Sequence, residues 1–330
     1  MLIKTIDELK QYVNADKNLS PASFGPSIQK AEDQYISVVL GQAQLAELQT
    51  AYDNNTLSAI QIQLLDQVRK AEASLAMYLL VPVLSVRIGD AGVLVAGGAD
   101  QQRAMQWQVD DLRNQFLFDG YNALDNLYNF LFANQGLFPE WQASDAYNEF
   151  TQYFINTVKD FQKEVDIDNS NWIFRRLIAI MENLEISNIL LTIGESFFDY
   201  LKAQITANTL AGDDLIAVQM LRKAIAPLTY SRALLDPNFT EVISIFQRPR
   251  SDAQDRRKWV KPDYSMLAET FRGEGENMLE RAKKFFNATA SPTVYAAYYT
   301  SDRYRQPHPD DKFKHDEFDN RNSTGSFMFL

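Results

Sequence analysis

Residues 32–75 read EDQYISVVLGQAQLAELQTAYDNNTLSAIQIQLLDQVRKAEASL. Moved along the chain by 153 positions without a gap, this stretch falls on residues 185–228, EISNILLTIGESFFDYLKAQITANTLAGDDLIAVQMLRKAIAPL, and 12 of the 44 positions are identical. Many of the other positions exchange one apolar residue for another. A stretch that recurs at a fixed spacing is the signature of repeated structural units. The sequence therefore predicts two similar modules packed side by side.

The repeat extends beyond these two stretches. A second set of glycine and large apolar residues recurs at a spacing of 155: Gly120, Leu124, Phe130 and Leu131 match Gly275, Leu279, Phe285 and Phe286. The last thirty residues have no counterpart and no apolar periodicity. We therefore expect a first module over residues 1–145, a second module over residues 146–299, and an extended C-terminal arm over residues 300–330.

Apolar residues recur every three or four positions through both modules, which is typical of helices with one buried face. Helices are expected over residues 3–13, 27–40, 43–54, 59–80, 101–118, 120–134, 147–166, 172–193, 196–207, 213–235, 264–270 and 274–286. The β-branched runs at 81–88 and 93–95 predict a hairpin, and the run at 242–246 predicts a strand in the second module. The expected fold is mainly α: tandemly duplicated helical bundles, each with a short β-hairpin or strand insertion.

Composition excludes several classes of site. The 330 residues include no cysteine, so disulfides, thiolate zinc sites, iron–sulfur clusters and a cysteine nucleophile are ruled out. The first residues are too short and too charged for a signal peptide, and no run of about 18 apolar residues suits a membrane span. The formal net charge of -11 disfavours unspecific binding of nucleic acid over the whole surface.

No common catalytic signature is present: there is no phosphate-binding loop, no dinucleotide fingerprint, no zinc-protease motif and no nucleophile elbow. His308 and His315 lie among acidic residues and could ligate a divalent metal, although an irregular arm more often is simply solvated. The carboxylate pairs Asp110-Asp111 and Asp213-Asp214 fit helix starts better than acid–base chemistry. We therefore expect no enzyme activity, no cofactor and no bound metal.

Two segments are candidates for binding partners. The first is a basic stretch that could contact an acidic protein or DNA phosphates, or could pair with acidic neighbours as a solvated loop: Arg248, Arg250, Arg256, Arg257 and Lys258. The second is an apolar tip that could dock on a neighbouring copy or on its own module, the alternative being a disordered tail: Phe327, Met328, Phe329 and Leu330.

The opening of the chain resembles a known family. Residues 2–13 read LIKTIDELKQYV, and after a short loop residues 28–36 read IQKAEDQYI, followed by Leu40-Gly41. This pattern resembles the head–tail adaptor (connector) proteins of tailed phages, over roughly residues 1–80. The whole chain also resembles phage and prophage proteins of Bacteroidetes of about this length. Adaptors are often a single module of about half this size, so a fused pair leaves the number of subunits in a ring open.

The resemblance implies a structural virion protein at the head–tail junction, assembled in the host cytoplasm without a membrane. It implies a homo-oligomeric ring of portal-matched symmetry that binds the portal protein on one side and tail, stopper or neck proteins on the other, with unspecific contact to DNA in the channel. The alternatives are another virion component, such as a tail-completion or cargo protein, and a metal-dependent or phosphoryl-transfer enzyme. A ring needs unlike, complementary faces on neighbouring subunits, whereas cargo does not.

Overall fold

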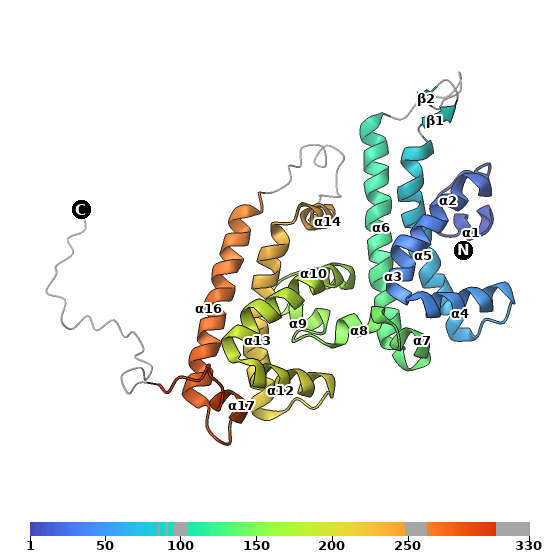
Figure 1. Cartoon of the computed structure of the whole chain (residues 1–330). Helices are drawn as coiled ribbons and strands as arrows, with labels where there is room; N and C mark the ends of the chain where they lie inside the picture. Colours follow the sequence, from blue (N-terminus) through green and yellow to red (C-terminus); the bar gives the residue numbers. More distant parts are fainter. Residues whose placement is uncertain (85, 90–91, 96–104, 248–262, 308–330) are drawn as a thin grey trace, which may run out of the picture.

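The computed structural model describes residues 1–84, 86–89, 92–95, 105–247 and 263–307. These residues are mainly helical, as predicted, and they form two bundles that stand beside each other (Figure 1). Apolar side chains of both bundles belong to one continuous core. Within the described ranges, no helix combines the length and the apolar character that crossing a membrane requires.

The first bundle is built by residues up to about 142. Its helices are α1 (Ile6–Lys10), α2 (Pro21–Ala31), the π-helical turn η1 (Glu32–Ile36), α3 (Ser37–Leu40), α4 (Gln42–Asp53), α5 (Ala59–Leu84), α6 (Gln106–Ala133), the 3-10 turn η2 (Gln135–Leu137) and α7 (Pro139–Gln142). The strands β1 (Val86–Gly89) and β2 (Gly92–Val95) lie between α5 and α6 and pair in antiparallel fashion, with Val86 opposite Val95.

The second bundle follows without a long linker. Its helices are α8 (Asp145–Thr151), α9 (Val158–Gln162), α10 (Asn171–Leu184), the π-helical turn η3 (Glu185–Leu190), α11 (Leu191–Ile193), α12 (Glu195–Thr206), α13 (Gly212–Leu234), α14 (Pro237–Gln247), α16 (Ser265–Thr289) and α17 (Ala296–Tyr299).

The two bundles present the same elements in the same order. In the first, α2 packs on α5 and α5 on α6; in the second, α10 packs on α13 and α13 on α16. Each bundle has a π-helical turn followed by a short α-helix that ends at a glycine, Gly41 or Gly194. These glycines adopt φ values of 72° and 83°, a left-handed region that side chains disfavour. The chain therefore turns in the same way at both places.

The correspondence reaches the early part of each bundle, where a threonine caps a short helix: Thr5 caps α1 and Thr157 caps α9. In both bundles an arginine of the long central helix donates one hydrogen bond to a backbone carbonyl and another to a carboxylate. The four bonds run from Arg69 Nε to Leu2 O (2.8 Å), Arg69 Nη2 to Glu8 Oε1 (2.5 Å), Arg222 Nε to Phe154 O (2.7 Å) and Arg222 Nη1 to Asp160 Oδ2 (2.6 Å). Each arginine ties the entering segment of its bundle to the central helix.

The long helices approach each other most closely at two glycines. A Cβ atom on Gly120 of α6 would lie 2.6 Å from the side chain of Leu75 on α5. A Cβ atom on Gly275 of α16 would lie 2.5 Å from the side chain of Leu228 on α13. Real Cβ atoms do not come this close to a neighbour, so glycine sets the spacing of both helix pairs.

Several predicted boundaries are wrong. From Gln106 onward, the helices expected over 101–118 and 120–134 form the single helix α6, and residues 101–104 lie outside the described residues. The helices expected over 264–270 and 274–286 form the single helix α16. Gly120 and Gly275 lie inside these helices because they allow close packing, not because they end them. The helix expected over 147–166 is two short helices, α8 and α9, separated by residues that carry the entering segment of the second bundle.

The strand predicted at 242–246 is also wrong, because these residues belong to α14. Phe239, Val242 and Ile243 are buried together, and their spacing of three and four is the helical one. The second bundle therefore has a helix where the first has its hairpin. Of the predicted arm, residues 300–307 follow α17, and Tyr304 packs against the core. Residues 308–330 lie outside the described residues.

Candidate functional site

The two bundles meet where α6 of the first faces α10 of the second. From one flank of the molecule to the other, the order of helices is α16, α13, α10, α6, α5 and α2 (Figure 1). Smaller contacts join α14 to α6 and α3 to α8. The spacing of apolar residues predicts the helices but not the contact between α6 and α10. This α6–α10 junction is the candidate functional site.

A carboxylate of the first bundle caps a helix of the second. Asp125 on α6 accepts a hydrogen bond at its Oδ1 from the backbone N–H of Trp172, with an N–O distance of 2.8 Å. It also accepts from the Ser170 side chain and from the N–H of Asn171, at the first turn of α10. Burial raises the pKa of Asp125 to about 6, and these hydrogen bonds oppose the rise only in part. Beside it, Asn171 Nδ2 donates to Asn129 Oδ1 at 3.0 Å.

Aromatic rings fill the rest of the junction. Trp172 is only 4% exposed, and its ring centroid lies 5.9 Å from that of Tyr35 and 5.6 Å from that of Tyr121. Further along α6, the ring of Phe150 on α8 packs edge-on against Tyr128, at 5.3 Å. These rings come from both bundles, so their burial stabilises the arrangement of the two bundles as well as each bundle alone.

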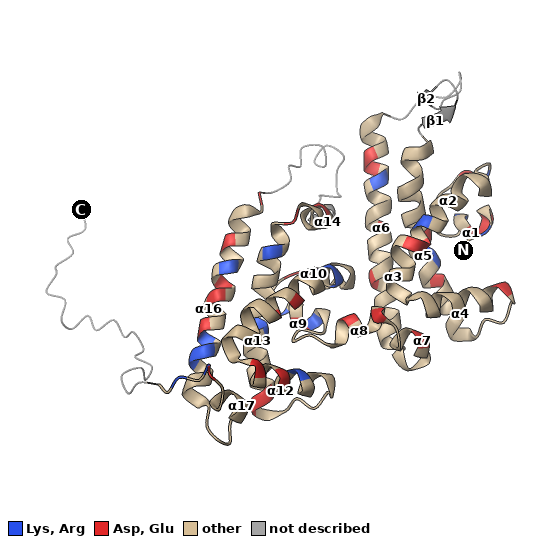
Figure 2. Ribbon diagram, in the orientation of Figure 1, with Lys and Arg blue, Asp and Glu red and all other residues tan. Residues whose placement is uncertain are grey.

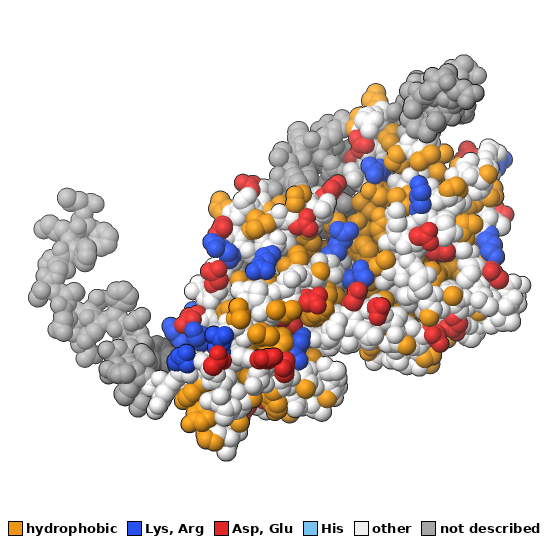
Figure 3. Space-filling model, viewed as in Figure 1, with side chains coloured by type: hydrophobic (Ala, Val, Ile, Leu, Met, Phe, Trp, Pro, Cys, Tyr) orange, Lys and Arg blue, Asp and Glu red, His pale blue; other side chains and the backbone are white. Residues whose placement is uncertain are grey.

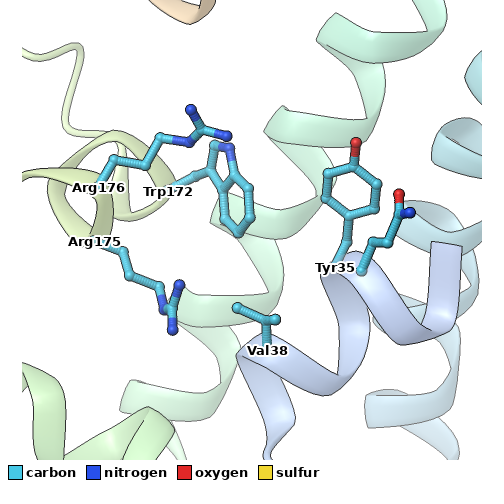
Figure 4. Close-up of a pocket in the computed structure, with 6 residues that line it drawn as sticks. Tyr35, Val38, Trp172, Arg175 and Arg176 are labelled. Atoms are coloured by element: carbon cyan, nitrogen blue, oxygen red, sulfur yellow. The ribbon is translucent and has the colours of Figure 1, made fainter. Parts of the chain in front are cut away.

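A pocket of about 420 Å³ opens beside Trp172 (Figure 4). Tyr35 and Val38 line one side, and Trp172, Arg175 and Arg176 line the other. The Arg175 guanidinium pairs with Glu149 at 2.9 Å, and that of Arg176 lies 5.6 Å from the centre of the Trp172 ring. Hydrophobic side chains gather in the hollow between the bundles (Figure 3). Aromatic and arginine side chains are the types that protein contact surfaces use most.

The candidate residues from the sequence do not lie at this junction. The basic stretch, Arg248, Arg250, Arg256, Arg257 and Lys258, lies outside the described residues, and so do the apolar tip, Phe327, Met328, Phe329 and Leu330, and both histidines, His308 and His315. Among the described residues there is no group of three or more histidine, aspartate or glutamate side chains that could hold a metal ion.

The two carboxylate pairs have different outcomes. Asp213 and Asp214 lie in the first turn of α13, as predicted. Asp110 and Asp111 lie one turn inside α6, which begins at Gln106, so the prediction that they open a helix is wrong by about one turn.

Comparison with known protein families shows the same spacing as the repeated stretches of sequence. A family model matches the chain twice, over residues 36–151 and over residues 189–307, and together these matches cover well over half of it. The chain belongs to DUF6712, a family of unknown function. The two matched segments of this DUF6712 protein begin 153 positions apart, the same spacing as the quoted stretches. Neither a curated protein nor a solved structure matches the chain.

Proposed function

We propose that this protein is a structural subunit of a tailed-phage head–tail connector, and that its two bundles are tandem copies of one module. In this role it forms a homo-oligomeric ring, docks on the portal protein and joins the capsid to tail or neck proteins. The resemblance of residues 1–80 to adaptor proteins supports the place in the virion. The double match to one family model supports the duplication.

The observation that carries this proposal is that the junction joins unlike faces. In the repeated order, α6 corresponds to α16, and α10 corresponds to α2. A two-fold arrangement would have paired α6 with α16, or α2 with α10, whereas here α6 meets α10. Among the described residues, such a head-to-tail contact leaves the α2 flank of the first bundle and the α16 flank of the second without a partner bundle, on opposite sides of the molecule (Figure 1). Contacts of this kind close into rings when the rotation between units allows it.

The same observation favours a ring over the other virion roles. A cargo or tail-completion protein has no need of two flanks that correspond to the two sides of an internal contact. The charge of the chain also suits a ring around DNA, because a body with a net charge of -11 repels the phosphate backbone as it passes.

The test is the mass of the purified full-length protein in solution, alone and mixed with the portal protein from the same genome. We expect a discrete ring, or a stable complex with the portal, and its mass gives the number of subunits. A protein that stays monomeric and does not bind the portal protein at any concentration would overturn the connector assignment. In that case metal analysis of the protein and of the His308→Ala and His315→Ala variants tests the enzyme alternative.

A further inference from the structure

We infer that the α16 flank of one copy binds the α2 flank of the next, and that Glu280 and Lys17 form an ion pair across this contact. The inference rests on the proposed ring, and it specifies which surfaces build it. Its basis is the internal junction, in which the side chain that corresponds to Glu280 already binds the segment that corresponds to Lys17.

Aligning α16 with α6, its counterpart in the first bundle, identifies Glu280 as the first member of the ion pair. Gly275 and Gly120 make equivalent close approaches to the neighbouring helix, which sets a spacing of 155 between the two helices. At this spacing Ala282 falls on Leu127, and all of these positions are buried. Asp125, the carboxylate that caps α10, therefore corresponds to Glu280. Glu280 is exposed on α16, in a row of acidic and basic side chains along that helix (Figure 2).

Aligning α2 with α10, its counterpart in the second bundle, identifies Lys17 as the second member of the ion pair. Phe24 and Ile28 of α2 correspond to Leu177 and Met181 of α10 at a spacing of 153, and all four are buried. Continued towards the N-terminus, this spacing places Lys17 at the position of Ser170, whose side chain bonds to Asp125. Within the ranges that the structure describes, neither Lys17 nor Glu280 forms an ion pair, and both are exposed.

The start of α2 also lacks what the start of α10 has. Ser170 caps α10 through its own side chain, which accepts from the N–H of Ile173 at 3.1 Å. Ser20, which precedes α2 and lies three positions after Lys17, makes no side-chain cap. A carboxylate that arrives from a neighbouring copy would therefore find both the Lys17 ammonium and the positive end of α2, as Asp125 finds the start of α10. Opposite charges at equivalent positions give the contact its direction and register.

Charge reversal in the full-length protein tests the pair. We expect Glu280→Lys and Lys17→Glu to weaken self-association roughly tenfold each, since each places like charges opposite one another. The double variant restores the attraction and should recover the wild-type oligomer mass. The control is Glu274→Lys, which makes the same charge change six residues earlier, about 240° around α16. A wild-type ring that neither reversal weakens would overturn this contact while leaving the connector proposal in place.

Cross-linking tests the direction of the contact. Because the chain has no cysteine of its own, a thiol reagent can react only with the introduced cysteines. We expect Lys17→Cys and Glu280→Cys proteins to form cross-linked dimers with a short bifunctional thiol reagent only when mixed, because each contact uses one of each surface. The doubly substituted chain should give a ladder of multimers. Dimers from either single variant alone would indicate a two-fold contact and refute the head-to-tail arrangement. No cross-link in the mixture, at concentrations where the wild type is oligomeric, would refute the assigned surfaces.

Discussion

Neutralising Asp125 should stabilise the protein at neutral pH and have a smaller effect in acid. The carboxylate is largely withdrawn from solvent at the junction, although the residue is not fully buried, and this desolvation raises its pKa from 3.8 to about 6. An acid whose pKa is higher in the folded state binds more protons when folded. The free energy of unfolding therefore falls as the pH rises through the window between these two values. Asp125→Asn keeps an oxygen that accepts from the N–H of Trp172 but carries no charge.

The size of the effect follows from the two pKa values. Above the folded pKa, the ionised carboxylate costs about 3 kcal/mol relative to the neutral form, since one pKa unit corresponds to about 1.36 kcal/mol. At pH 5 the same relation leaves a cost of about 1.6 kcal/mol. The stability advantage of Asp125→Asn over the wild type should therefore grow by about 1.4 kcal/mol between pH 5 and pH 8.

Urea denaturation followed by circular dichroism measures this difference at each pH, and it isolates one side chain because every other titrating group is common to both proteins. Asp110→Asn is the control, since Asp110 is exposed on the same helix. Asp125→Ala separates charge from capping, because it removes the acceptor and leaves the start of α10 without its partner, at a cost of about 1–3 kcal/mol. A difference between wild type and Asp125→Asn that stays constant from pH 5 to pH 8 would refute the buried, ionised cap.

Two further substitutions test the packing of the second bundle, both by urea denaturation. Gly275→Ala should destabilise the protein by about 1–3 kcal/mol, because its Cβ would clash with α13, whereas Gly273→Ala has open space and should be neutral or stabilising by up to about 1 kcal/mol. Arg222→Ala should cost about 2–4 kcal/mol, because it leaves the partly buried Asp160 carboxylate without its inner partner. Lys163 also pairs with Asp160, but its side chain is 68% exposed, so Lys163→Ala should cost under about 1 kcal/mol. Equal losses within either pair would contradict the assignment.

The repeat in the sequence predicted much of the fold because the repeated residues set backbone geometry. Gly41 and Gly194 end helices at the same φ region, and Asn55 and Asn208 both adopt left-handed conformations in the following turns. Arg69 and Arg222 recur because each anchors the segment that enters its bundle. Identities at such positions carry structural information directly, since few other residues satisfy the same geometry.

The errors arose where one residue type serves two purposes. Glycine ends helices, but inside a helix it also lets a neighbour approach, and the sequence alone did not tell Gly120 from Gly41. The β-branched run at 242–246 has the composition of a strand, yet burial against α13 and α6 selects a helix. In both cases tertiary packing decided between two local conformations that the residues permit.

The junction could not be predicted because it depends on residues that the repeat does not share. Asp125 and Trp172 correspond to Glu280 and Leu19 in the other bundle, so comparing the two copies hides the contact between them. Nothing in the spacing of Asp125 sets it apart from other acidic residues on a helix. Its role depends on burial beside the start of α10, which only the packed arrangement creates.

The difference between the inner and outer faces agrees with a chain that assembles only when it meets its partners. At the internal junction Tyr121 and Tyr128 are buried, and a permanent contact within one chain tolerates such apolar faces. The corresponding positions on α16 are Glu276 and Lys283, which are charged and at least partly exposed. Charged faces keep a free subunit soluble and hold a contact weakly. Many such contacts, closed into a ring, can then be stable where each one alone is not.

If charge holds these contacts, as we propose, the proposed ring should loosen as salt rises from about 0.05 M to 0.5 M, while the internal junction persists. Sedimentation at these two salt concentrations, with circular dichroism as the check on folding, separates the two contacts; a salt-independent ring would mean that apolar surfaces hold the copies together.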